Sequence, residues 1–268
     1  MARRLEALSA FGRDDLSLAR LAEPHVDAMA ILSDLGRTPS IAGIYAVWAS
    51  EGGVEDRLTV EQHITGWRLK GGKAFCSGAD LCDAALITVH DQNDRHVIVE
   101  VDLGAARGAG QMATDLEGWV TPAFAATTTA AVHFSEYRSE PMFALADASC
   151  YFDRPGFWHG ALGPAALWAG GAQGLLDSIR PYARRDPHAR AALGSMEATA
   201  WTMRAALQLA GDEVDAADAD PEAARRRAIV VRHLVERWCT SMIDSAGLAA
   251  GPRPLAYDAA VIRRVQEL

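Results

Sequence analysis

The spacing of apolar residues along the chain changes twice. From Asp14 to Leu35 they recur every three or four residues, which predicts one amphipathic helix with Pro24 as a kink and Gly36 as its end. The next part of the chain contains short apolar runs separated by turn residues, a pattern typical of antiparallel strands. These runs lie at 44–48, 67–69, 85–89, 97–101 and 131–134.

The helical spacing returns after Pro155 and continues to the end of the chain in three long apolar stripes. Three long amphipathic helices with short connections predict an antiparallel bundle. The expected fold class is therefore α+β. A small antiparallel β domain at 41–150 would follow a residual N-terminal helical region at 1–40 and precede a C-terminal helical bundle at 151–268.

Composition narrows the class of protein. Half of the residues are apolar, enough for a packed core, and no apolar run reaches the roughly twenty residues that cross a bilayer. The formal net charge of −9 argues against binding to a nucleic-acid backbone. The four cysteines form no C-x-x-C pair and the eight histidines stand apart from one another, so we expect no metal site. We expect a cytoplasmic protein with no membrane segment.

Two short segments of the β region and one at its exit carry candidate chemistry. Ser50-Glu51 follows an apolar run, and the stretch 66–77 supplies a Gly, a Lys, an aromatic residue and a Ser at fixed steps. The third segment, 153–163, contains an Arg-Pro followed by Gly-Ala-Leu-Gly. Common nucleotide-binding and hydrolase motifs are missing from the sequence, and the glycines at 170–174 are more typical of close helix packing than of a phosphate loop.

In this order, the three segments resemble the acyl-CoA dehydrogenase family. The resemblance covers the chain from about residue 16 onward and implies the family's fold, with part of the N-terminal helical region absent. It also implies FAD as cofactor and acyl-CoA thioesters of fatty acid metabolism as substrates. Carried over from the family, Trp48, Ser50, Phe75 and Ser77 are the flavin-contact candidates. Alternatively, the two serines are turn residues and the two aromatic residues belong to the sheet core.

The sequence departs from the family at the position of the catalytic base. In most members this glutamate follows a segment that corresponds to 257–260 here, and the sequence up to Leu268 does not include it. In some members the base stands just before the Arg-Pro, where this chain has Asp153, with Arg154 beside it favouring the charged form. The structural alternative is that Asp153 only caps a helix, since Asp is a preferred N-cap residue.

Three hypotheses follow from this resemblance. The first is a flavoprotein that dehydrogenates an acyl-CoA thioester, with hydride transfer to FAD and an electron-accepting flavoprotein as a further partner. The second is a catalytically degenerate paralogue that acts as a structural or regulatory subunit of a complete enzyme. The third is a monooxygenase of the same fold that uses reduced flavin. In each case we expect a homodimer or a heteromer with a related subunit, because a three-helix bundle would otherwise expose apolar surface.

Overall fold

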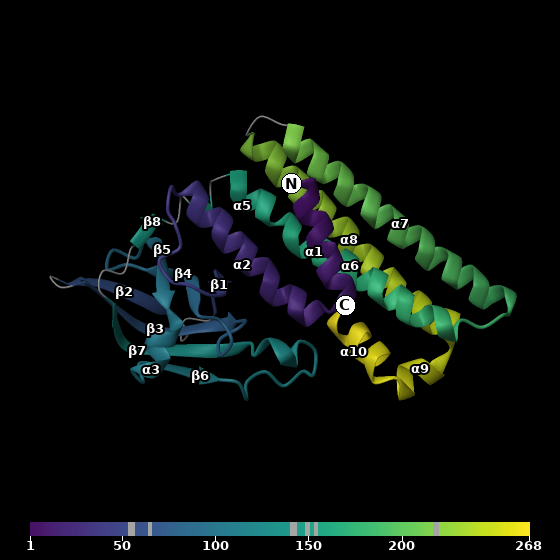
Figure 1. The fold of residues 1–268 in the computed structure, drawn as a ribbon, viewed down its shortest axis with the longest axis horizontal. Helices are drawn as coiled ribbons and strands as arrows, with labels where there is room; N and C mark the ends of the chain where they lie inside the picture. Colours follow the sequence, from purple (N-terminus) through teal and green to yellow (C-terminus); the bar gives the residue numbers. More distant parts are fainter. Residues whose placement is uncertain (53–56, 64–65, 140–143, 148–150, 153–154, 217–219) are drawn as a thin grey trace. The chain divides into compact units, whose positions relative to one another are not determined.

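The computed structural model describes residues 1–52, 57–63, 66–139, 144–147, 151–152, 155–216 and 220–268. The chain divides into two compact units, one mainly helical and one built on a β-sheet (Figure 1). The helical unit comprises Met1–Glu23, Pro122–Phe124 and Trp158–Leu268. The sheet unit comprises Pro24–Thr121 and Ala125–Phe157. The expected α+β class is confirmed, whereas the domain boundaries at 40/41 and 150/151 stay predictions.

Within the described residues, the sheet unit contains eight strands in the order β6-β7-β3-β2-β4-β5-β8, with β1 paired to β4 outside this path. They are β1 (Tyr45–Trp48), β2 (Leu58–His63), β3 (Gly66–Cys76), β4 (Ala84–His90), β5 (His96–Asp102), β6 (Met112–Asp115), β7 (Ala130–Ser139) and β8 (Ala144–Asp147). Most pairs are antiparallel as predicted, but β1 and β2 both run parallel to β4. The short helix α3 (Leu103–Gly108) begins at Asp102, whose carboxylate accepts a hydrogen bond from Ala105 N.

Strand β4 is buried along nearly its whole length, which explains its continuous apolar sequence. Because neighbouring side chains of a strand point to opposite faces, Leu86 and Ile87 enter two different cores. Leu86 packs with Ala28 and Ile31, three residues apart on one helix face. The sheet is thus covered on one side by helical residues and closed on the other by its own side chains.

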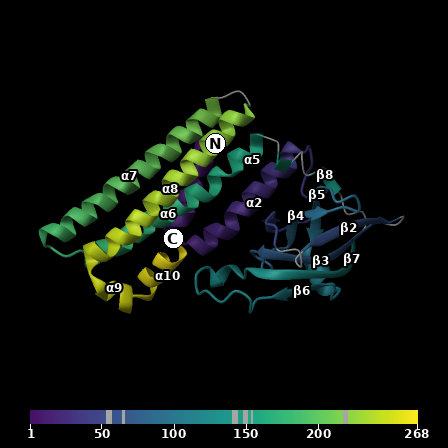
Figure 2. The same cartoon turned by 180° about the vertical axis from the view of Figure 1, so that it is seen from behind.

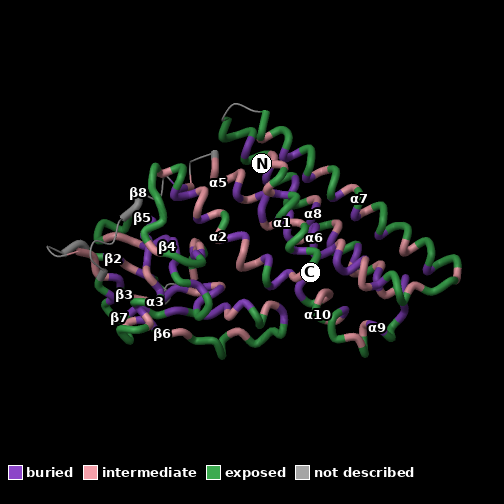
Figure 3. The backbone as a smooth tube through the Cα atoms, viewed as in Figure 1, coloured by how far each residue is buried: buried purple, intermediate pink, exposed green. Residues whose placement is uncertain are grey.

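The helical unit is formed largely by long helices that lie side by side in both views (Figures 1 and 2). Besides α3, the described residues form the helices α1 (Ala2–Asp14), α2 (Leu16–Asp34), α5 (Pro155–Gly160), α6 (Leu162–Ile179), α7 (Pro187–Ala216), α8 (Pro221–Ala250), α9 (Pro252–Tyr257) and α10 (Ala259–Glu267). Short 3₁₀ turns lie at Ala125–Thr127 and Arg180–Tyr182. Buried positions follow α6 and exposed positions recur along α7 (Figure 3). The three long helices predicted from the apolar stripes are confirmed, and they are α6, α7 and α8.

Helix α1 was not predicted, and it packs closely against α6. A Cβ added to Gly12 would collide with the backbone of Leu167, and one added to Gly170 would collide with the backbone of Ser9. The glycines at 170–174 therefore serve close helix packing, as the sequence indicated. Within the described residues, no helix combines the length and the hydropathy that a membrane crossing requires.

Candidate functional site

The end of β3 leaves regular strand geometry at Phe75. The β3–β7 pairing shifts register between Lys73 and Cys76, and Phe75 has a φ of +59°. This left-handed conformation is unfavourable for a bulky residue and is typical of functional sites. The ring of Phe75 is also exposed, at 61 %, although Cys76 beside it is buried. The backbone therefore holds an aromatic ring outside the core at a local energetic cost.

Ser77 is fixed by two segments that are distant in the sequence. The indole Nε1 of Trp48, at the end of β1, donates a hydrogen bond of 2.9 Å to the carbonyl of Ser77. The hydroxyl of Ser77 accepts a hydrogen bond of 3.0 Å from Thr129. Trp48 and Thr129 are themselves buried, so Ser77 is held by rigid neighbours.

A chain of hydroxyl groups ends at Ser77. Thr127 Oγ1 lies 2.8 Å from Thr129 Oγ1, and Thr129 donates to Ser77. The carbonyl of Thr127 accepts a hydrogen bond of 2.8 Å from Gly78 N, which ties the two loops together. Among the described residues, none accepts the Ser77 hydroxyl proton. Hydroxyls in series polarise one another, so Ser77 is prepared to donate that proton to a ligand.

A buried lysine holds the segment that follows β1. Lys73 is 2 % exposed, and its ammonium donates to Thr88 O at 2.7 Å, to Thr88 Oγ1 at 3.2 Å and to Glu51 Oε1 at 3.2 Å. All three protons are used, as a buried ammonium requires. Burial raises the pKa of Glu51, but Lys73 and then His90 and His96 lower it more, so the pKa lies below its ordinary value. Lys73 thereby fixes the segment containing Ser50 and Glu51.

The six residues predicted for the site have different outcomes. Trp48, Phe75 and Ser77 lie together at the ends of β1 and β3. Ser50 is exposed, and among the described residues no hydrogen bond joins it to the other three. Asp153 and Arg154 lie outside the described residues. The roles of all six stay predictions.

The sequence interpretation missed Lys73, Thr127 and Thr129 as parts of this arrangement. Lys73 belongs to the motif already noted, and its burial beside Glu51 was the missing information. Thr127-Thr128-Thr129 is a conspicuous run of hydroxyl residues. Its partner Ser77 is fifty-two residues away from Thr129, so only the fold reveals their contact.

The donor set fits a flavin ring. An isoalloxazine has two flat faces and an edge rich in hydrogen-bond acceptors, and here an exposed aromatic ring stands beside a hydroxyl with an available proton. Thr128, between Thr127 and Thr129 in the sequence, has a buried Oγ1 without a hydrogen-bond partner within the described part of the chain. Phe75 would contact the ring and Ser77 its polar edge.

No protein-family profile and no curated protein matches this chain. Solved structures do match it over nearly its whole length. The dibenzothiophene monooxygenase TdsC from Paenibacillus sp. A11-2 superposes with a TM-score of 0.82 at 18 % identity over 99 % of this chain and 77 % of its own. The methanesulfinate monooxygenase MsuC from Pseudomonas fluorescens gives 0.80 at 16 % identity, covering 99 % and 76 %. XiaF from Streptomyces sp., solved with FADH2, gives 0.78 at 14 % identity, covering 98 % and 75 %.

These matches establish the fold and correct the sequence interpretation. The acyl-CoA dehydrogenase-like fold is confirmed. The identification of the chain as an acyl-CoA dehydrogenase is wrong, because TdsC and MsuC, which match this fold, are monooxygenases, and TdsC binds FMN.

Proposed function

We propose that this chain is a monooxygenase that works with reduced flavin supplied by a separate reductase. The observation that carries the proposal is the chain of hydroxyls ending at Ser77 beside the exposed ring of Phe75. It is supported by fold neighbours that are monooxygenases, among them TdsC with bound FMN and XiaF with FADH2. The isoalloxazine ring is common to FMN and FADH2, and Ser77 and Phe75 would contact only that part of either cofactor.

Ser77, Phe75 and Trp48 have different roles in this proposal. Ser77 donates a hydrogen bond to the polar edge of the flavin and stabilises negative charge there. Phe75 covers part of the ring and excludes water. Trp48 is a positioning residue, because its indole N–H holds the carbonyl of Ser77.

A reduced flavin supplies the electrons with which one atom of O₂ enters a substrate while the other leaves as water. This reaction needs no carboxylate to take an α-proton from a thioester. The roles predicted for Asp153 and Arg154 are therefore not required. The protein has to orient the substrate, hold the flavin edge through Ser77 and keep bulk water away.

The test is an ¹⁸O₂ incorporation assay with the full chain, FMN and an NADH-driven flavin reductase. Dibenzothiophene, indole and methanesulfinate are suitable first substrates. TdsC is a dibenzothiophene monooxygenase that has also been solved with bound indole, and MsuC is a methanesulfinate monooxygenase. We expect one ¹⁸O atom per product molecule with at least one of them, and none without the reductase. Saturable binding of reduced flavin with no oxygen transfer to any of the three would contradict the assignment and favour the non-catalytic subunit.

A further inference from the structure

The hairpin formed by β4 and β5 brings together two histidines that stand apart in the sequence. His90 ends β4, His96 begins β5, and the two are directly opposite in the antiparallel register. Directly opposed residues point to the same face of a hairpin. Their ring centroids are 4.1 Å apart. The two imidazole rings therefore lie next to each other at the end of the hairpin.

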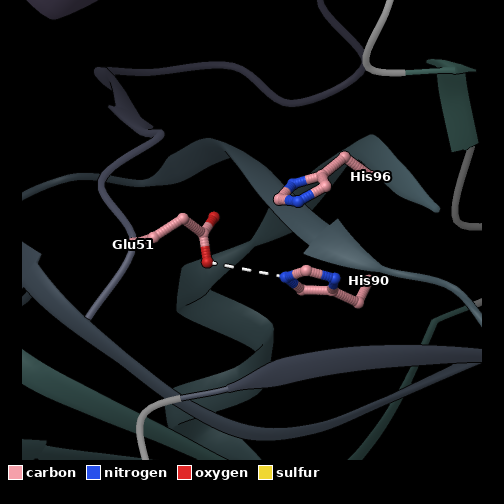
Figure 4. A group of neighbouring side chains, drawn as sticks. All are labelled: Glu51, His90 and His96. Atoms are coloured by element: carbon pink, nitrogen blue, oxygen red, sulfur yellow. Dashed lines mark ion pairs between the residues drawn. The ribbon is translucent and has the colours of Figure 1, made fainter. Parts of the chain in front are cut away.

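A carboxylate from another segment completes the group. Glu51 follows β1, and its Oε2 lies 3.6 Å from His90 Nε2. One ligand atom from each of Glu51, His90 and His96 can be chosen so that all three lie within 4.8 Å of one another. Figure 4 shows the three side chains converging from different backbone segments.

Neighbouring residues fix the orientation of two of these side chains. Asp94 Oδ1 lies 3.1 Å from His90 Nδ1, which leaves Nε2 directed toward Glu51. Lys73 binds Oε1 of Glu51 and leaves Oε2 for the histidines. Metal-binding histidines usually have their second nitrogen held by a carboxylate in this way.

The third side chain has an unsatisfied nitrogen. His96 Nδ1 is buried and has no hydrogen-bond partner among the described residues. Leaving such an atom unpaired is unfavourable, and coordination of a cation by this nitrogen would satisfy it. This observation is independent of the distances that define the group.

The ligand set and its charge determine which ion fits. Two imidazoles and one carboxylate suit Zn²⁺, Co²⁺ or Ni²⁺ better than Ca²⁺ or Mg²⁺, which prefer oxygen ligands. Lys73 beside Glu51 and Arg57, whose Nη2 lies 3.2 Å from His90 Nδ1, place positive charge nearby and limit the affinity. The Glu51 side chain is 44 % exposed, so water can complete the coordination.

We propose that Glu51, His90 and His96 bind one divalent transition-metal ion of the Zn²⁺ type. The ion links the β4–β5 hairpin to the segment after β1 that Lys73 also holds. The proposal does not rest on the proposed flavin-dependent reaction, and its test does not depend on activity.

The test is calorimetric titration of the chelator-treated full chain with Zn²⁺. We expect one ion per chain, binding that weakens tenfold or more in both His90→Gln and His96→Gln, and no effect of equal concentrations of Mg²⁺. His133→Gln is the matched control, because His133 is an exposed histidine of the same sheet unit on β7, and it should bind Zn²⁺ as the wild type does. Wild-type protein that takes up no stoichiometric Zn²⁺, or histidine variants that keep full affinity, would overturn the proposal.

A measurement on the unaltered protein guards against variants that fail to fold. Side-chain ¹⁵N spectra of the eight histidines are recorded before and after one equivalent of Zn²⁺. The proposal requires the signals of His90 and His96 to shift while those of the other histidines stay in place. Shifts confined to other histidines, or no shifts, would refute it.

Discussion

At the scale of single residues, Phe75 combines an unfavourable backbone conformation with an exposed apolar ring. Glycine adopts a positive φ without the penalty that a larger residue has there, about 1–2 kcal/mol. We expect Phe75→Gly to leave the melting temperature unchanged or raise it, while weakening flavin binding. Phe134→Ala is the contrast, because Phe134 is fully buried and its loss should cost about 3–5 kcal/mol. Thermal melts and flavin titration of both variants check this, and a marked loss of stability in Phe75→Gly would assign the ring a core role.

The buried thiol of Cys239 makes the free energy of unfolding depend on pH. Burial, and then Glu236, raise the pKa of this thiol to about 12, from 9.0 without the fold. Between these two values the unfolded chain is deprotonated while the folded chain is not, so stability falls as pH rises. The loss is at most about 1.4 kcal/mol per pH unit. Urea unfolding between pH 8 and pH 11 should show a shallower alkaline decline for Cys239→Ala than for the wild type. Parallel curves would contradict the assigned shift.

At the scale of elements, the α1–α6 pair depends on glycines. Gly170→Ala would push a methyl group into the backbone of Ser9, so we expect a loss of several kcal/mol. Gly194 on α7 is the matched control, because an added Cβ there meets no atom within 4 Å. Gly194→Ala should stabilise the protein by up to about 1 kcal/mol. Denaturant unfolding measures both, and equal effects of the two substitutions would show that the close approach is not maintained in solution.

The sequence predicted the elements whose apolar pattern is long or uninterrupted. The long helices α6, α7 and α8 and the strands β1, β3, β4, β5 and β7 were located, because their core faces repeat clearly. Strands β2, β6 and β8 are short or polar, and helix α1 buries only two leucines, Leu5 and Leu8. Their position depends on partners distant in the chain.

The candidate site likewise contains residues that the local sequence predicted and contacts that only the fold reveals. Ser77 and Phe75 were found from a local motif. The Thr129–Ser77 hydrogen bond and the His90–His96 pair arise from strand pairing and loop contacts, which local spacing does not encode. The same motif led to the identification as an acyl-CoA dehydrogenase, which the matched structures contradict.

At the scale of the whole molecule, we propose that the chain forms a dimer or a larger assembly. On α7, Met203 is fully buried within the chain. Large apolar side chains are instead exposed on α7 and α8: Trp201, Leu209, Ile229 and Val230. Light scattering at micromolar concentration should give at least twice the mass of one chain, 28.7 kDa. A monomer under these conditions would contradict the proposal.

The most direct test of the central claim, a reduced-flavin site at Ser77, is anaerobic titration of the protein with reduced FMN. We predict saturable binding at one site per chain, weakened roughly three- to tenfold in Ser77→Ala, because one hydrogen bond is lost. Ser135→Ala, an exposed serine on β7, should bind as the wild type does. No saturable binding of reduced FMN or FADH2 up to roughly 100 μM, or equal affinity in Ser77→Ala and the wild type, would contradict the account.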